Sequence, residues 1–413
     1  MAIQSVRRVL VVASTFPAAP ADASPAFVRD LMLALKTAHP EVAFAVLAPQ
    51  VGVGMSWHTR HEEYDEFRFA YAWPRSAQRL TGRGILPALR REPWLVALVP
   101  FLFRGEHVAL RRLVREWIPD VIHAHWFTPQ GIVAAMVSKE TGVPMVLTTH
   151  ASDVSIWARI PLLGTSVVRR WFPRAARITA VSKQTLDRAR QFFTDAEWEA
   201  IRPRTAIIPM GVTPVAADHA HLPSATRTVL FLGRFAEKKG IPFLIDAVAR
   251  LARKDIKLVI AGTGPEKRRI EAQVQRAGLA DRVLFPGFVT AMQKARLIAS
   301  ADVIAVPSID TSSGDSEGLP VVILEALAAG VPCVATDASG AGEVMEHGVH
   351  GWLVPQRDPA ALAAAIDTAL ALDADARARL RHSARARARE FAWPQVARRH
   401  WDFLFANPDH IDC

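Results

Sequence analysis

Short runs of β-branched and aliphatic residues alternate with helical patterns from one end of the chain to the other. In the first half these runs include Val9–Val12, Val121–His125 and Met145–Thr149, each followed by a loop and a segment of helical spacing. Strands separated by helices pair in parallel sheets with helices on their faces, so the sequence predicts an α/β protein with doubly wound parallel sheets. The other expected strands are Val42–Leu47, Arg177–Val181, Ala206–Pro209, Val229–Leu232, Lys257–Ala261, Val283–Phe285, Val303–Val306, Cys333–Ala335 and Gly351–Val354.

The chain length and a loss of sequence periodicity near residue 213 indicate two domains. A chain of 413 residues is too long for one ordinary hydrophobic core. Residues 213–224 lack periodicity and are typical of a linker. We therefore expect Rossmann-like domains over residues 1–213 and 214–394 that face each other across a cleft. In such sheets, ligands bind at the carboxyl ends of the strands.

The last part of the chain is expected to be helical. Residues 360–390 have the pattern of a helix, in which Asp373 and Asp375 form a D-x-D sequence that we interpret as solvated surface. Phe391–Pro394 interrupts this pattern, and a last amphipathic segment follows from residue 395.

The composition excludes several classes of protein. The two cysteines, Cys333 and Cys413, cannot form a disulfide framework and fit a reducing compartment. No apolar run approaches the roughly 20 residues of a membrane-spanning helix, and the apolar N-terminus favours a buried strand over a signal peptide. The net charge of +10 is concentrated in residues 1–213, which hold 26 Lys and Arg against 17 Asp and Glu. This asymmetry indicates an anionic partner for the first half.

Two carboxylates, Glu317 and Glu325, bracket seven uncharged residues. Glu325 lies in an apolar run with Pro320 near its start and Gly330 at its end, which predicts a short, mostly buried helix with Pro320 in its first turn. Burying a carboxylate is costly unless it finds partners, and a ligand with vicinal hydroxyls would be such a partner.

Two glycine-containing loops follow strands in the second half. The loop 233–240 carries Arg234, Lys238 and Lys239, which could hold a pyrophosphate or could form a basic turn. Gly262 and Gly264 resemble the start of a dinucleotide fingerprint, but Lys267 occupies the third glycine position. A nicotinamide dehydrogenase is therefore disfavoured.

Histidines mark two strands of the first half. His123 and His125 alternate, so both point to one face, but no cysteine or carboxylate cluster accompanies them to complete a metal site. His150 follows a strand and precedes Asp153 closely. A structural hydrogen bond and a role in catalysis are both open for His150.

Taken together, these residues resemble the retaining glycosyltransferases of the GT-B fold, glycosyltransferase family 4 (glycosyl transferases group 1). The resemblance covers nearly the whole chain. It rests on the order and spacing of Asp120–His125, Thr149-His150-x-x-Asp153, Val181-Ser182, Ile208–Val212, Gly233-Arg234…Lys239-Gly240, Ala261–Pro265, Arg282–Gly287, Glu317-x₇-Glu325, Ser339–Glu343 and Gly348…Pro355.

The resemblance implies a role for each candidate residue. Arg234 and Lys239 would bind the diphosphate of a nucleotide-sugar donor, Glu325 the ribose hydroxyls, and Glu317 the hydroxyls of the transferred sugar. His150 would contact the donor sugar near the reacting carbon. Backbone groups of the 317–320 loop would face the sugar and phosphate, and the nucleobase would pack after Gly287. The remaining candidates for donor binding are Gly318, Leu319, Pro320, Gly262, Gly264, Phe288 and Val289.

The resemblance also implies the reaction chemistry and the roles of the two domains. The first domain, with the segment 395–413 packed back on it, would bind the acceptor, and the second domain would bind the donor. Fixed cations and a helix N-terminus would stabilise the departing diphosphate, so no divalent metal or other cofactor is expected. The transfer would retain the anomeric configuration.

Some residues depart from the family pattern and indicate a subgroup. Ala151 stands where glycine is common, and Met210 where asparagine is frequent. The segment Phe16-Pro17…Ser24-Pro25-Ala26-Phe27-Val28 resembles transferases of capsule, colanic-acid or teichuronic-type polymers, which act on lipid-linked acceptors.

Two basic, aromatic stretches favour contact with an anionic membrane; the alternative is that their aromatic residues belong to the core and their arginines form a solvated rim. One runs from Arg90 to Arg115 and the other from Trp157 to Arg177. We expect a cytoplasmic protein, peripheral on the inner face of the membrane, that moves a hexose from a UDP- or GDP-sugar to a lipid-linked glycan. The alternatives are a soluble acceptor such as a sugar phosphate, and a non-catalytic two-lobed sugar-binding protein. No nucleic-acid-binding module matches.

Overall fold

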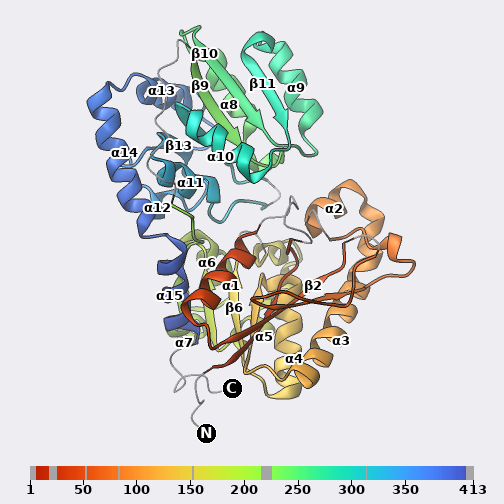
Figure 1. Ribbon diagram of the computed structural model, residues 1–413. Coiled ribbons are helices and arrows are strands. Elements are labelled where there is room, and N and C mark those ends of the chain that lie inside the picture. The colour runs from red at the N-terminus through yellow and green to blue at the C-terminus, as the bar shows by residue number, and fades with distance from the viewer. Residues whose placement is uncertain are drawn as a thin grey trace. The chain divides into compact units, whose positions relative to one another are not determined.

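The computed structural model describes residues 6–17, 26–51, 54–81, 84–150, 153–214, 226–312 and 314–405. It forms two compact units, Met1–Pro209 with Val396–Cys413 and Met210–Gln395, which are described one at a time (Figure 1). Most of the expected linker at 213–224 lies outside the described residues, as do Ser24, Pro25, Ala151 and Cys413.

The first unit is built on an eight-stranded sheet in the order β3-β4-β2-β1-β5-β6-β7-β8. In the described part of this sheet, β3 pairs antiparallel with β4 and the other neighbours are parallel. The strand order reverses between β1 and β5, as in doubly wound folds. The strands are β1 Arg8–Val12, β2 Ala43–Pro49, β3 His58–Arg60, β4 Asp65–Phe69, β5 Val121–His125, β6 Met145–Thr149, β7 Arg177–Ala180 and β8 Thr205–Ile207.

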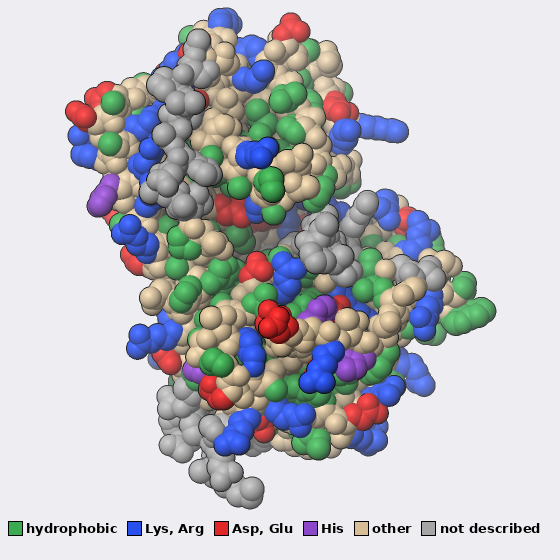
Figure 2. Space-filling view, in the orientation of Figure 1, with side chains coloured by type: hydrophobic (Ala, Val, Ile, Leu, Met, Phe, Trp, Pro, Cys, Tyr) green, Lys and Arg blue, Asp and Glu red, His purple; other side chains and the backbone are tan. Residues whose placement is uncertain are grey.

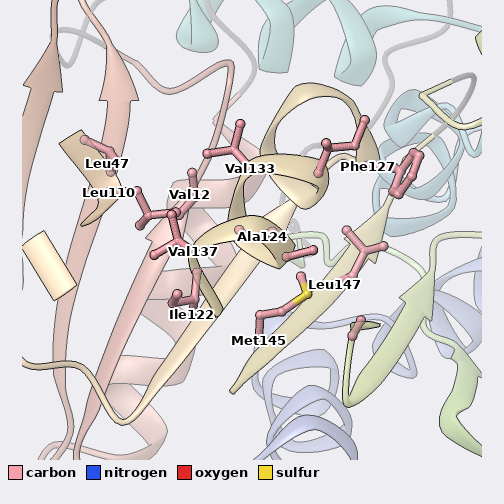
Figure 3. Close-up of a cluster of buried hydrophobic side chains, with 14 of the residues drawn as sticks. Val12, Leu47, Leu110, Ile122, Ala124, Phe127, Val133, Val137, Met145 and Leu147 are labelled. Carbon is pink, nitrogen blue, oxygen red and sulfur yellow. The ribbon is translucent and has the colours of Figure 1, made fainter. Parts of the chain in front are cut away.

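One face of this sheet carries the core shown in Figure 3. Val12 and Ile122 pack there against Leu110 of α3 and Val133 of α4, because alternate strand residues point to the same face. The helices of this unit are α1 Phe27–Ala38, α2 Ile85–Arg91, α3 Val99–Trp117, α4 Ile132–Thr141, α5 Pro161–Trp171, α6 Lys183–Arg190 and α7 Asp195–Ile201.

The chain returns to the first unit with its last helix, α15 (Trp393–Leu404). The ring of Trp401 stacks on His39 with 3.7 Å between centroids, and Phe405 lies edge-on to His123. Since His123 alternates with the core residue Ile122 along β5, α15 covers the sheet face opposite α3 and α4.

The second unit has a six-stranded sheet in the order β11-β10-β9-β12-β13-β14, with parallel pairing throughout its described strands. The strands are β9 Arg227–Leu232, β10 Ile256–Ala261, β11 Val283–Gly287, β12 Val303–Val306, β13 Cys333–Thr336 and β14 Trp352–Val354. The helices are α8 Ile241–Arg250, α9 Lys267–Arg276, α10 Ala291–Ser300, α11 Val321–Ala329, α12 Ala341–Val344, α13 Pro359–Leu370 and α14 Ala374–Arg389.

Each face of the second sheet has its own core. Val229 and Phe231 of β9 join a cluster with α8, α9 and α13, whereas Leu230 and Leu232 join one with α10, α11 and α14. Alternate residues of one strand thus pack against two different layers of helices, as a parallel sheet buried on both faces requires.

Arginines of α14 cap the carboxyl ends of three other helices. Arg377 donates to the carbonyl of Ala369 in α13, Arg385 to Ala329 in α11 and Arg387 to Glu343 in α12. These guanidinium groups satisfy terminal carbonyls and place positive charge at the negative end of each helix.

The stretch 360–390 contains two helices where one helical stretch was expected. Asp373 is the N-cap of α14, and its carboxylate accepts from the backbone N–H of Ala376 at 2.7 Å. Asp373 and Asp375 are both exposed, which confirms their interpretation as solvated surface, but the role of Asp373 as an N-cap was not expected. An N-cap aspartate satisfies a free N–H and starts a new helix.

The strands β3 and β4 were not expected, and β4 holds a buried charge cluster. Arg68 is 3% exposed and donates to Glu66 at 2.5 Å. The same guanidinium donates to the carbonyls of Pro49, Phe16 and Pro17. The loop that follows β1 is therefore held by a side chain from β4.

Arg68→Met should lower the free energy of unfolding by about 3 kcal/mol, because it removes one partner of a buried ion pair. Urea unfolding monitored by circular dichroism measures this change. Arg202→Met is the matched control, since its pair with Glu199 is exposed and contributes at most about 0.5 kcal/mol. Equal losses in the two variants would contradict the assigned role of Arg68.

Candidate active site

The loops after β9 and β12 meet where the strand order of the second sheet reverses. β9 lies between β10 and β12, and ligands of doubly wound sheets bind outside the carboxyl ends of strands at such a point. The backbone N–H of Ile309, after β12, donates to the carbonyl of Lys238, after β9, at 2.8 Å. Residues 233–240 and 307–320 therefore form one local site within the second unit.

Two lysines and two carboxylates form the charged part of this site. Lys239 Nζ lies 2.9 Å from Glu317 Oε2, and Lys238 Nζ lies 3.3 Å from Glu317 Oε1. Lys238 also reaches Asp315 Oδ1 at 3.2 Å and donates to the carbonyl of Ser316. The structure thus brings the candidates Lys239 and Glu317 into direct contact, although they are 78 residues apart in the sequence.

The lysines keep Glu317 ionised. Burial alone would raise the pKa of Glu317, but the charges of Lys239 and Lys238 outweigh it and lower the pKa to about 2. Burial correspondingly opposes the charge of Lys238, and the carboxylates of Glu317 and Asp315 overcome it and raise the pKa of Lys238. At neutral pH Glu317 is therefore a carboxylate and Lys238 an ammonium group.

The candidate glycines allow the loop after β10 to pack closely on the loop after β9. Gly262 has a φ of +140°, and a Cβ there would lie 1.9 Å from the carbonyl oxygen of Gly233. A Cβ on Gly264 would lie 2.3 Å from the carbonyl oxygen of Phe235. The packing of the chain itself requires both glycines, and their contact with a ligand stays a prediction. Arg234, on the same loop as Gly233, is partly buried.

Helix α11 follows the 307–320 loop and carries Glu325. Pro320 is the N-cap residue of α11 rather than a residue of its first turn, because its ψ of 115° is extended. Gly330 ends the helix in the left-handed region, as expected. Glu325 is 20% exposed at its side chain and pairs with Lys294 Nζ of α10 at 2.5 Å. Gly318, one of the buried residues before α11, accepts a hydrogen bond from the N–H of Gly340.

The segment after β11 offers apolar surface. Phe288 is 54% exposed, whereas Val289 packs partly buried against the core below α10 and α11. Thr290 and Gln293 then form a capping box that starts α10. The position of Phe288 is compatible with its expected contact with a nucleobase, which stays a prediction.

His150 lies in the first unit, in a buried cluster of histidines. Its Nε2 lies 3.1 Å from His125 Nδ1, and His123 Nε2 lies 2.8 Å from Thr148 Oγ1. The rings of His123 and His125 are 4.2 Å apart on one face of β5, as their alternation predicts. Within the described residues, no group of three or more His, Cys, Asp or Glu is arranged to hold a metal ion.

Burial sets the charge of this cluster. It lowers the pKa of His150 to about 3, with a further contribution from His400, so His150 is neutral at physiological pH. Burial raises the pKa of Asp153 to about 7, against the hydrogen bonds that it accepts from Phe127, Thr149 and His150. Asp153 thereby joins the loops that follow β5 and β6.

Two residues at the site were missing from the candidate list. Lys238 stood in the basic loop but received no role, although its place beside Lys239 in the sequence was an available signal. Lys294 lies in no motif, and its pairing with Glu325 joins two helices that the sequence does not mark as neighbours.

Glu317→Gln should lower the free energy of unfolding at pH 7 by about 3 kcal/mol, because the pKa of Glu317 is about 2 when folded and about 4.5 when unfolded. A lowered carboxylate pKa stabilises the fold above the unfolded pKa, and this stabilisation is lost as the pH falls toward the folded pKa. The difference between wild type and variant should therefore shrink between about pH 5 and pH 2. Urea unfolding at pH 7, 5 and 3.5 measures it, with Glu271→Gln at an exposed pair as control. A difference that stays constant to pH 3.5 would contradict the assignment.

Comparisons with known proteins identify the family and the fold of the chain. A family model described as Glycosyltransferase Family 4 matches residues 58–214, and one described as Glycosyl transferases group 1 matches residues 217–389. The structure of sucrose-phosphate synthase from Thermosynechococcus elongatus superposes with a TM-score of 0.74 over 96% of this chain and 98% of that one. Their sequences are 22% identical, so this likeness shows a shared fold.

Two curated relatives extend the comparison. WcaL of Salmonella typhimurium, named for colanic acid biosynthesis, is 31% identical over 259 residues, which cover 61% of this chain and 62% of that protein. A GDP-mannose-dependent alpha-(1-6)-phosphatidylinositol monomannoside mannosyltransferase of Mycobacterium tuberculosis is 30% identical over 309 residues, which cover 72% of this chain and 78% of that protein. The chain has the GT-B fold, with two parallel-sheet α/β units, and it belongs to the glycosyl transferases of group 1, glycosyltransferase family 4.

Proposed function

We propose that the chain transfers a hexose from a UDP- or GDP-sugar to a lipid-linked glycan in the biosynthesis of a cell-surface polysaccharide. The observation that carries this proposal is the cluster of Lys238, Lys239 and Glu317 at the carboxyl ends of β9 and β12, with Glu325 on the helix that follows. The second unit would bind the donor and the first unit the acceptor.

The charges of the site suit a leaving diphosphate. In the structure Lys239 is neutralised by Glu317, so an incoming diphosphate would take over Lys239 and release the carboxylate. Glu317 would then accept hydroxyls of the transferred sugar, and Arg234 would add a second cation for the phosphates. Fixed cations stabilise charge as it develops on the leaving group, and we propose that no divalent metal is required.

We propose that the transfer retains the anomeric configuration, with neither Glu317 nor His150 acting as the base. Glu317 is a carboxylate and His150 a neutral imidazole at physiological pH. We propose that the acceptor attacks from the face that the diphosphate leaves, and that a phosphate oxygen takes the acceptor proton. His150 would donate or accept a hydrogen bond at the donor sugar. Nuclear magnetic resonance of the anomeric proton of the product tests retention.

The proposal of a lipid-linked acceptor rests on the names of relatives and on the surface of the first unit. WcaL is named for colanic acid biosynthesis, and the mycobacterial relative for a phosphatidylinositol monomannoside. On α3 and the turn before it, Trp94, Phe101 and Val108 are each more than half exposed. Exposed arginines share the outer surface of α3: Arg104, Arg111, Arg112 and Arg115.

Exposed aliphatic side chains also lie at the start of α5. Ile160 is 51%, Leu162 91% and Leu163 56% exposed. Figure 2 shows hydrophobic side chains lying among Lys and Arg side chains on the visible face. Phe172 and Arg177 of the same sequence stretch are buried, so these two belong to the core and not to a membrane contact.

Exposed apolar groups beside arginines are typical of proteins that lie on anionic bilayers. Among the described helices, none combines the length and apolar character needed to cross a membrane. We therefore propose peripheral binding at the inner face of the cytoplasmic membrane.

Nucleoside diphosphates should stabilise the protein. At about 100 times the dissociation constant, UDP, GDP or ADP should add about 3 kcal/mol to the free energy of unfolding and raise Tm. Arg234→Ala should reduce the shift strongly, whereas Arg268→Ala, at an exposed site on α9, should leave it unchanged. No shift with any of the three nucleotides would refute the proposed donor.

Vesicles with acidic lipid should bind the protein at low salt. Arg104→Gln with Arg115→Gln should weaken co-sedimentation with phosphatidylglycerol vesicles by about fivefold per charge, because each arginine near the surface contributes about 1 kcal/mol. Arg389→Gln, at an exposed arginine of the second unit, is the control. Equal binding to neutral phosphatidylcholine vesicles, or no binding at all, would overturn the membrane proposal and favour a soluble acceptor.

A further inference from the structure

An ion pair connects α10 to the carboxylate that is proposed to bind the ribose. Lys294 Nζ lies 2.5 Å from Glu325 Oε1, with side-chain exposures of 39% and 20%. The two residues are 31 positions apart and lie on neighbouring helices. The contact therefore fixes a side chain of α11 from outside its own helix.

A capping box fixes the start of α10 and thereby the place of Lys294 on the helix. The side chain of Thr290 accepts from the N–H of Gln293, and the side chain of Gln293 accepts from the N–H of Thr290. This capping box lies between Phe288 and Lys294 in the sequence. Phe288 is 54% and Met292 66% exposed, so apolar surface is available on the segment that leads to Lys294. A flat, partly apolar ligand against Phe288 would thus have a hydrogen-bonding carboxylate within the same unit.

We propose that Lys294 is a positioning residue for nucleotide binding. It would hold Glu325 through Oε1 and leave Oε2 to accept from the vicinal hydroxyls of a ribonucleoside diphosphate. This inference rests on the proposed donor site. A carboxylate has about four acceptor positions on its two oxygens, so one ammonium group does not saturate it.

The charge of Lys294 gives this arrangement a second effect. A nucleotide that covers Glu325 would remove water from the carboxylate, and an unpaired buried carboxylate is costly. The ammonium group would remain beside Glu325 and keep its charge compensated while the ribose is bound. The cost of covering the carboxylate would therefore be lower than for Glu325 alone.

Two other roles for Lys294 lead to different measurements. As an exposed pair that only joins α10 to α11, it would contribute little to nucleotide binding. As a direct phosphate ligand, it would act independently of Glu325. A double-mutant cycle separates both roles from positioning, because only a residue that acts through Glu325 loses its effect when Glu325 is changed.

The test uses the full chain and isothermal titration with UDP, GDP and ADP. Binding of any of them to the wild type is the separate check on the proposed donor site, and its absence refutes that site whatever Lys294 does. With the nucleotide that binds most tightly, Lys294→Met should raise Kd by about fivefold, the upper range for one partly exposed ion pair. Lys294→Arg should restore most of the affinity.

The cycle then compares Glu325→Gln with Glu325→Gln/Lys294→Met. The two should bind the nucleotide equally, and Lys294→Met should raise the donor KM while leaving kcat unchanged. Lys267→Met, which breaks the exposed pair with Glu271 on α9, is the matched control and should not change Kd. Circular dichroism confirms that each variant is folded.

Three outcomes would overturn the proposal. An unchanged Kd in Lys294→Met would make the pair a surface contact between two helices. A fivefold loss that persists in the Glu325→Gln background would make Lys294 a direct ligand. A loss that Lys294→Arg does not reverse would show that the positive charge beside Glu325 is not what matters.

Discussion

Burial of both faces of each parallel sheet is the constraint on which the rest of the structure depends. In β9, Val229 and Phe231 face one layer of helices, while Leu230 and Leu232 face the other. Such a strand has no side chain left to offer a ligand, so polar groups collect in the loops at its carboxyl end. The reversal of strand order between β9 and β12 then decides which two loops meet. The charged cluster of the second unit lies in these two loops because the topology brings them together.

The charges in those loops are tolerated because they compensate one another. Lys238 and Lys239 face Asp315 and Glu317, and all four are largely buried. Removing one member of such a cluster leaves an uncompensated charge, which costs more than the pair contributes. An anionic ligand can instead replace a carboxylate at a lysine without leaving that lysine unpaired. A balanced cluster of this kind is suited to exchanging partners with a diphosphate.

Much of the fold could be predicted from the sequence, because the local signals agreed with the tertiary structure. β5 and β12 begin and end at the expected residues, and Gly330 ends α11 as its position indicated. β3 and β4 were missed because they are short and polar, and because Arg68 of β4 is buried by contacts to distant carbonyls. Asp373 was correctly interpreted as surface, but its role as an N-cap was missed because an N-cap aspartate and any other exposed aspartate have the same sequence signature.

The site was predicted less completely, because the residues that make contact there are far apart in the sequence. Motif spacing identified Glu317, Glu325 and Lys239, but it could not show that Lys239 pairs with Glu317 or Lys294 with Glu325. These contacts depend on how strands and helices pack across the sheet, which no local pattern encodes.

The pairing of Glu317 with Lys239 also changes how the two carboxylates are interpreted. A pair of glutamates first suggests acid–base catalysis, yet a carboxylate with a pKa of about 2 cannot supply a proton at neutral pH. With pKa values of about 2 and about 3, Glu317 and His150 are also weak bases for the acceptor hydroxyl, which supports the proposal that the departing phosphate itself receives its proton.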